Sequence, residues 1–296
     1  MLIKKMIKSS NLKYLIFSSL VAIFFLKGCT ESVDAPQRGK ATIYVDESVI
    51  NMVEAQVEAF VKLYPEAIIQ LDTLTAREGI VKILNDEAEL FISSRELNKE
   101  EVEFIQKTNR EVRVNKICFD GVVVIASKQM GIDRIKLSDL KDLLRGDSKK
   151  YRVFIPQKNS GIYEYLQKDI LEGAELAGVE VVNSEFDIKE KVLNTRNSIG
   201  LLGYNTLDED TSEVRMLKIG WMKNPTIGEI YFEPHQAYFI NGDYPLTRLI
   251  YFILNDKRFG VATGFSSFLT GNEGQTIIKE EKLGPATVPV KLVPSN

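Results

Sequence analysis

Short apolar runs alternate along this chain with stretches in which apolar residues recur at helical spacing. Thr42–Val45, Ala67–Leu71 and Glu89–Ile92 are short runs typical of strands. Between the first two, apolar residues recur every three or four positions from Val49 to Val61, which predicts an amphipathic helix that ends at Tyr64-Pro65. This alternation of strands and helices predicts an α/β protein.

The same alternation continues through the second half of the chain. Asp120–Ala126 contains a continuous run of β-branched residues, typical of a strand buried on both faces. Loop structure is expected after Trp221. The other predicted strands are Val153–Ile155, Val179–Val182 and Ile199–Leu202, and the predicted helices are Ser138–Arg145, Ile162–Leu171, Leu246–Leu254, Phe259–Leu269 and Gly274–Glu280.

Small polar residues recur where predicted strands give way to helices. Thr75 with Glu78 and Asn98 with Glu101 have the spacing of capping boxes. Ser48, Ser93-Ser94 and Ser160-Gly161 stand at similar junctions. Helix N-termini carry unpaired N–H groups that can hold an anion, and in an open α/β sheet such junctions converge on one crevice. A single serine or threonine at such a place is more often a structural cap, so both interpretations stay open.

The N-terminus has the pattern of a secretory leader. Lys4, Lys5, Lys8 and Lys13 precede an apolar run, Leu15–Leu26, that is too short to span a bilayer as a helix. The following Lys27-Gly28-Cys29 resembles the lipobox of bacterial lipoproteins, in which the cysteine becomes the lipidated N-terminus. We therefore expect residues 1–28 to be a signal peptide, Cys29 to carry lipid, and residues 29–40 to form a tether. An uncut signal anchor is the alternative.

Composition narrows the class of protein. A net charge of −3 with 44% hydrophobic residues is typical of a soluble globular body and disfavours a nucleic-acid binder. If Cys29 carries lipid, Cys118 has no disulfide partner, and its apolar surroundings predict a buried core residue.

Catalytic patterns are scarce. The chain has one histidine, His235, beside Pro234 in a predicted polar loop, which excludes a histidine-based metal cluster. A hydrolase would need His235 to join serine and aspartate partners that the sequence does not single out. We expect a non-enzymatic protein without metal or cofactor.

The order of motifs resembles the phosphate-binding proteins of phosphate ABC transporters, within the type II periplasmic binding protein class. The resemblance covers most of residues 41–290. Its motifs are Phe60–Pro65, Ser93–Leu97, Asp120–Val124, Asn159–Gly161, Ser198–Tyr204, Tyr244–Arg248 and Gly274-Gln275.

The resemblance implies two α/β lobes joined by crossing strands, with an anion between them. Lobe I would hold residues 41–120 and 230–296, and lobe II residues 121–229. The implied binding residues are Glu47, Ser48, Thr75, Arg77, Ser94, Arg95, Ser160, Gly161 and Ile162. The implied partners are phosphate or a related oxyanion and a membrane permease. We expect a monomer, anchored by lipid in the cell envelope on the outer side of a membrane.

Several family positions carry other residues here. Asp46-Glu47-Ser48 replaces a turn that is usually Gly-Ser-Thr-like, Pro156 stands where an arginine is common, and Ile162 stands where threonine is usual. In one interpretation Arg77 and Arg95 replace the missing arginine, while Glu47 accepts a hydrogen bond from a protonated phosphate. In the other, the ligand has changed or been lost, and the protein is a surface recognition or sensor module with the same fold.

Overall fold

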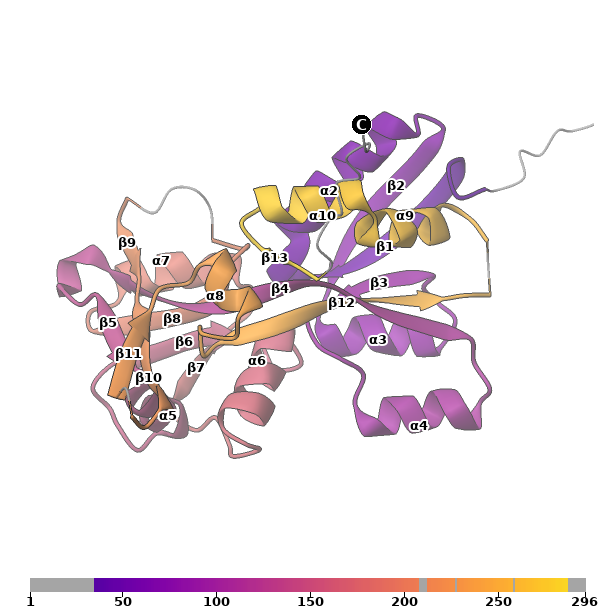
Figure 1. Cartoon of the computed structure of the whole chain (residues 1–296). Helices are drawn as coiled ribbons and strands as arrows, with labels where there is room; N and C mark the ends of the chain where they lie inside the picture. The colour runs from indigo at the N-terminus through magenta and orange to yellow at the C-terminus, as the bar shows by residue number, and fades with distance from the viewer. Residues whose placement is uncertain (1–34, 208–211, 227, 258, 287–296) are drawn as a thin grey trace, which may run out of the picture. The chain divides into compact units, whose positions relative to one another are not determined.

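A computed structural model describes residues 35–286 except 208–211, 227 and 258. The predicted signal peptide and the predicted lipidation site at Cys29 lie outside these described residues. The described chain contains one large mixed sheet and a smaller three-stranded sheet (Figure 1). The predicted α/β class is confirmed.

In the first half of the large sheet, β1 lies between β2 and β3 and is parallel to both. β12 pairs antiparallel with β3, and β4 pairs antiparallel with β12. The strands are β1 (Gly39–Asp46), β2 (Ala67–Leu74), β3 (Leu90–Ser93), β12 (Thr247–Asn255), β4 (Val112–Ser127) and the short β13 (Gly284–Pro285). The helices are the 3-10 turn η1 (Glu47–Val49), α2 (Ile50–Leu63), α3 (Ala76–Leu84), α4 (Lys99–Lys107), α9 (Val261–Thr270) and α10 (Asn272–Glu280). Helices α2, α9 and α10 lie on one face of this half and α3 on the other (Figure 1).

The second half of the sheet begins on the same long strand, β4. Residues Val122–Ala126 of β4 pair antiparallel with β8 (Ser198–Gly203), which runs parallel to β6. The other strands are β6 (Arg152–Pro156), β7 (Val179–Val182), β9 (Val214–Met216), and β5 (Arg134–Lys136), β10 (Lys218–Asn224) and β11 (Gly228–Phe232) in the small sheet. The helices are the 3-10 turn η2 (Lys128–Met130), α5 (Leu137–Arg145), α6 (Gly161–Tyr165), the π-helical turn η3 (Leu166–Ile170), α7 (Phe186–Asn194) and α8 (Gln236–Ile240).

Separate apolar cores support the two halves. One core contains Ile43, Phe60 and Phe252, and another contains Val122, Leu144 and Phe239. Strand β4 is 16 residues long and contributes to both, so it is one of the connections between the lobes. Tyr244 and Leu246 also belong to the second core. We therefore propose that the chain returns to lobe I at β12 and not near residue 230.

Two expectations about individual elements were wrong. Leu246–Leu254 is not a helix but the central strand β12, paired with β3 on one side and β4 on the other. Because β12 is buried on both faces, it is apolar at nearly every position and shows no period that separates strand from helix. Paired strands also lie where loop structure was expected after Trp221, since β10 continues to Asn224 and β11 follows it. The predicted helix Ile162–Leu171 is present: it begins at Gly161 and takes π geometry at Leu166.

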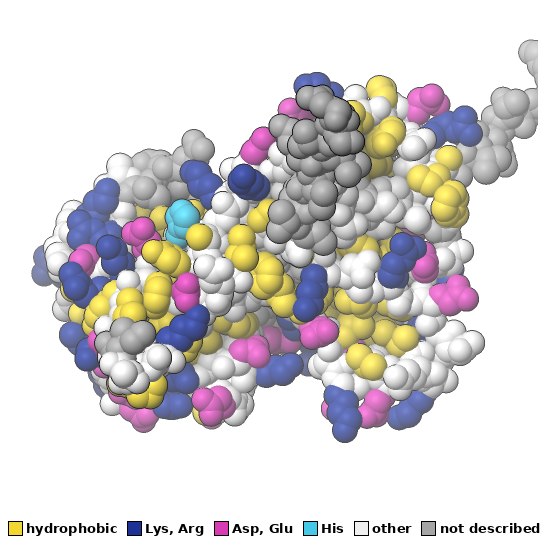
Figure 2. Space-filling model, viewed as in Figure 1, with side chains coloured by type: hydrophobic (Ala, Val, Ile, Leu, Met, Phe, Trp, Pro, Cys, Tyr) yellow, Lys and Arg dark blue, Asp and Glu magenta, His cyan; other side chains and the backbone are white. Residues whose placement is uncertain are grey.

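Several local predictions are confirmed. Thr75 and Asn98 each form a reciprocal capping box with the glutamate three residues later. Cys118 is fully buried in the first core. His235, the cyan residue of Figure 2, is exposed, and its ring Nδ1 accepts a hydrogen bond from the backbone N–H of Ala237 at the start of α8.

Candidate functional site

The ends of four strands bring polar residues together between the two lobes. β1 leads to Asp46–Ser48, β3 to Ser94, β6 to Ser160-Gly161 and β8 to the residues after Gly203. β1 is parallel to β3, and β6 is parallel to β8. Their carboxyl ends therefore meet at the crevice where open α/β sheets bind ligands.

The two lobes approach each other very closely at Gly161. A methyl group placed at Gly161 would lie 1.6 Å from the Ser94 hydroxyl oxygen and 3.1 Å from Asp46 Oδ2. Only glycine fits there. Asp46 is itself held from within its own turn, because its Oδ1 accepts hydrogen bonds from the backbone N–H of Ser48 at 3.1 Å and from the Ser48 hydroxyl at 2.5 Å.

Several buried polar atoms in this region have no hydrogen-bond partner among the described residues. They are Asp46 Oδ2, Ser94 Oγ, Asp120 Oδ1, Glu185 Oε1 and Arg248 Nη1. Native proteins pair nearly all buried polar groups, so unpaired ones indicate a functional role. The set combines two donors, Ser94 Oγ and Arg248 Nη1, with carboxyl oxygens of Asp46, Asp120 and Glu185, which is suited to an oxyanion that also carries a proton.

Arg248 is the buried cation of this region. Its Nε and Nη2 atoms donate to Asp120 Oδ2 at 2.9 and 2.7 Å, and the side chains are 2% and 0% exposed. Burial works to lower the pKa of Arg248, but Asp120, Glu185 and Asp46 outweigh it and raise the pKa. Arg248 therefore stays charged at the centre of three acidic residues.

Glu185 is a second buried ionisable group, and it is kept largely protonated at neutral pH. Burial raises the pKa of Glu185 to about 8, Asp46 adds to the rise, and Arg248 opposes it. Its Oε2 atom accepts hydrogen bonds from the Gly203 N–H at 3.0 Å and from the Thr206 hydroxyl at 3.2 Å. With its proton on, Glu185 adds no negative charge to the crevice.

The predicted replacement cations, Arg77 and Arg95, are placed differently from the expectation. The guanidinium of Arg95 forms a two-pronged pair with Glu101, at 2.8 Å for each bond, and its Nε lies 2.5 Å from Glu164 of lobe II. The Arg77 side chain is exposed, and its backbone N–H donates to the Asn159 carbonyl at 3.3 Å. Arg95 is thus neutralised by two carboxylates.

Glu47 does not point to the Ser94–Gly161 contact as the predicted acceptor would. Its Oε1 accepts a 2.5 Å hydrogen bond from the Ser184 hydroxyl, and its Oε2 accepts from the Glu185 backbone N–H at 3.0 Å. Asp46, the preceding residue, has the free carboxylate oxygen near Gly161.

The remaining predicted residues divide between the crevice and local structure. Ser48, Ser94, Ser160 and Gly161 are buried near the contact between the lobes. Ser160 also caps α6, since its hydroxyl accepts from the Tyr163 N–H at 3.1 Å. Thr75 serves the capping box of α3, and the Ile162 side chain is buried in the core of lobe II, so neither side chain is free to reach an anion.

Sequence reasoning missed Asp46, Asp120, Glu185 and Arg248 as site residues. Asp120 and Arg248 begin and end two of the motifs that carry the family resemblance, which was a usable signal. No such signal in the sequence marks Glu185, because a glutamate beside a polar turn looks like any solvated acid. Only the packing of β8 against it reveals its burial.

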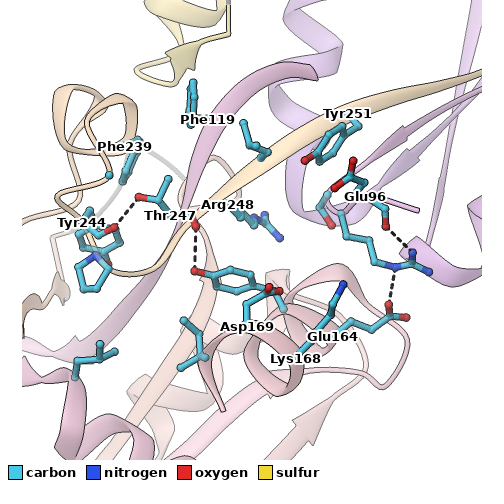
Figure 3. A pocket seen from close by; sticks show the side chains of 18 of the residues that line it. Glu96, Phe119, Glu164, Lys168, Asp169, Phe239, Tyr244, Thr247, Arg248 and Tyr251 are labelled. Atoms are coloured by element: carbon cyan, nitrogen blue, oxygen red, sulfur yellow. Dashed lines mark hydrogen bonds and ion pairs between the residues drawn. The ribbon is translucent and has the colours of Figure 1, made fainter. Parts of the chain in front are cut away.

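A cavity of about 750 Å³ adjoins this region. Figure 3 shows Glu164 and Lys168 on one side of the cavity and Glu96 and Tyr251 on another, with Arg248 to the left of both pairs in this view. The space-filling view shows acidic and basic side chains lying together where the two lobes meet (Figure 2). The cavity is therefore lined by charged side chains of both signs together with aromatic and aliphatic ones.

Two absences hold for the part of the chain that the structure describes. Its histidine, cysteine and acidic side chains form no cluster of three or more that could hold a metal ion. None of its helices is both long enough and apolar enough to cross a membrane.

Comparison with known proteins defines the class. A family model described as "PBP superfamily domain" matches residues 30–273, and the chain belongs to this superfamily of two-lobed binding proteins. The predicted type II periplasmic-binding-protein fold and the predicted non-enzymatic character are confirmed at the level of the family.

Individual relatives are similar at low identity. The chain is 20% identical over 231 residues to the phosphate-binding protein PstS of Staphylococcus saprophyticus, covering 74% of this chain and 70% of the relative. It is 23% identical over 264 residues to protein SphX of Synechococcus elongatus, covering 81% and 75%. A phosphate-bound, putative phosphate ABC transporter substrate-binding protein from Clostridium perfringens aligns with a TM-score of 0.72 at 20% identity, covering 84% of this chain and all of that one.

Proposed function

We propose that this protein is an extracytoplasmic receptor that binds inorganic phosphate between its lobes, is anchored by lipid at Cys29, and delivers phosphate to an ABC permease. The observation that carries the proposal is the Ser94 hydroxyl, which is buried and unpartnered directly against Gly161. Relatives named as phosphate-binding proteins support the choice of ligand.

The proposed contacts follow from the donors and acceptors in the crevice. Ser94 and Arg248 Nη1 would donate to phosphate oxygens, and Asp46 Oδ2 would accept a hydrogen bond from a P–OH group. Sulfate has no proton to give at neutral pH, so it could not donate a hydrogen bond to Asp46 Oδ2. No bond is made or broken, and the binding energy arises from charge-assisted hydrogen bonds formed away from water.

Calorimetric titration of the body from residue 31 tests this function. We expect heat with phosphate and weaker or no binding with sulfate or molybdate. Ser94→Ala should weaken phosphate binding about tenfold or more, since a hydrogen bond to a charged group contributes about 1.5–3 kcal/mol. Gly161→Ala should abolish binding, because the added methyl group meets Ser94.

The matched control is Ser138→Ala, on the exposed start of α5. It should bind phosphate like the parent protein. No heat with phosphate would refute the function and favour a recognition or sensor module. Binding unchanged in Ser94→Ala and Gly161→Ala would refute the site.

A further inference from the structure

The two lobes are joined by direct bonds between their own residues on both sides of the proposed phosphate position. Three groups of these cross-lobe bonds are centred on Glu47, Asn205 and Arg95, and a further bond joins the Arg77 backbone N–H to the Asn159 carbonyl. Each group uses a residue of one lobe to satisfy polar groups of the other. Polar groups of each lobe therefore have hydrogen-bond or ion-pair partners in the other lobe.

The Glu47 group places a carboxylate of lobe I at the start of α7 in lobe II. The two acceptor oxygens take the Ser184 hydroxyl at 2.5 Å and the Glu185 N–H at 3.0 Å. A negative charge at a helix N-terminus is favourable, because the first N–H groups are unpaired and carry partial positive charge. Glu47 thus supplies from within the chain the interaction that an external anion would make.

The Asn205 group occupies the start of α2 from the opposite lobe. Asn205 is 8% exposed, its Oδ1 accepts from the Met52 N–H at 2.6 Å, and its carbonyl accepts from Asn51 Nδ2 at 2.8 Å. Beside it, the Thr206 hydroxyl lies 3.1 Å from the Ser48 carbonyl and shares its one proton between that carbonyl and Glu185 Oε2. The first turn of α2 is therefore bound to lobe II.

On the other side of the crevice, Arg95 pairs with Glu164 across the lobes. Between these groups, Ser94 Oγ lies where any atom added to Gly161 would be. The cross-lobe bonds and the Ser94–Gly161 contact occur together in one arrangement. A phosphate ion placed between Ser94 and Gly161 would have to separate the lobes there and stretch these bonds.

We propose that the cross-lobe bonds are a built-in competitor of phosphate: they hold the lobes together without ligand and set the phosphate concentration at which the crevice opens to accept it. The inference rests on the proposed function for the identity of the anion. It changes the expected mechanism, because ligand binding then exchanges one closed arrangement for another. The apparent affinity for phosphate is then lower than that of the open form, in proportion to the fraction of molecules that are open.

The experiment combines solution scattering and calorimetry on the body from residue 31. In the parent protein, the radius of gyration without phosphate should match the value at saturating phosphate. In Glu47→Ala with Asn205→Ala it should be larger without phosphate and return on its addition. Glu47→Ala alone should bind phosphate about tenfold more tightly, because two hydrogen bonds that compete with phosphate binding are lost.

Two further variants separate this effect from a change in charge or folding. Glu54→Ala makes the same charge change on the exposed face of α2 and should leave affinity and scattering unchanged. Ser184→Ala removes one of the two donors to Glu47 from lobe II and should shift affinity in the same direction as Glu47→Ala, by less. A larger radius in the unliganded parent protein, or weaker phosphate binding in Glu47→Ala, would overturn the inference.

Failure of the proposed function is distinguishable from this outcome. If no variant gives heat with phosphate, the phosphate receptor is refuted. The radius of gyration without phosphate, compared between the parent protein and the Glu47→Ala, Asn205→Ala double variant, still decides whether the cross-lobe bonds hold the lobes together.

Discussion

At the scale of single residues, the buried acid Glu185 links the crevice to pH. Burial raises its pKa in the folded protein from the ordinary 4.5 of a glutamate to about 8. Between these values the unfolded chain has lost the proton while the folded protein retains it. The unfolded state therefore binds fewer protons, and the free energy of unfolding falls as pH rises from about 4.5 to about 8.

Glu185→Gln should remove this part of the pH dependence. A glutamine keeps an oxygen acceptor for the Gly203 and Thr206 donors but carries no charge. The variant should unfold at nearly the same urea concentration as the parent at pH 5. Near pH 8 it should be more stable by roughly 4 kcal/mol, at 1.36 kcal/mol for each pH unit.

Urea unfolding curves at several pH values make the measurement. Glu58→Gln, an exposed acid on α2, is the control and should run parallel to the parent protein. If Glu185→Gln also ran parallel, Glu185 would be ionised in the folded state.

Sequence alone identified the cap at Thr75, which depends on neighbours three residues apart, but not Glu185, whose environment comes from β8.

At the scale of elements, the contact between β4 and β12 contains the buried ion pair Asp120–Arg248. The two strands pair from Val112 to Gly121, and the pair lies where β4 passes from one core to the other. Burial raises the pKa of Asp120, whereas Arg248 lowers it. Each charge is tolerated in the interior because the other is present.

Arg248→Met should destabilise the protein by about 3–5 kcal/mol at pH 7, because it leaves Asp120 buried without its partner. Adding Asp120→Asn to that variant should recover much of the loss. Chemical denaturation of the two single variants and the double variant gives the coupling between them. If Arg248→Met were within about 1 kcal/mol of the parent in its free energy of unfolding, Asp120 would reach water or become protonated without cost.

At the scale of the whole molecule, the predicted lipid anchor is testable through the two cysteines. The full chain produced in bacteria should partition into the detergent phase in Triton X-114 separation. Cys29→Ala should move to the aqueous phase, because the thiol that would carry lipid is gone. Cys118→Ala, a change in the core far in sequence from the leader, should remain in the detergent phase. Detergent partition of Cys29→Ala would point instead to an uncut signal anchor.

The sequence by itself determined the features that depend on nearby residues or on a regular period. These are the amphipathic helix α2, the capping boxes of α3 and α4, the buried strand at Asp120–Ala126, and an order of motifs sufficient to recognise the family. Such features arise from interactions within a few residues, or from a pattern that repeats along one element. They need no knowledge of the fold.

Only the tertiary structure decided what the site residues do. Glu47, Arg77 and Arg95 have the chemistry of ligand contacts, yet Glu47 bonds to Ser184, 137 positions away, and Arg95 pairs with Glu164 of the other lobe. The strand identity of β12 also depends on neighbours distant in sequence. A charged group is defined by the partner nearest in space, and that partner is set by how the two lobes fold together.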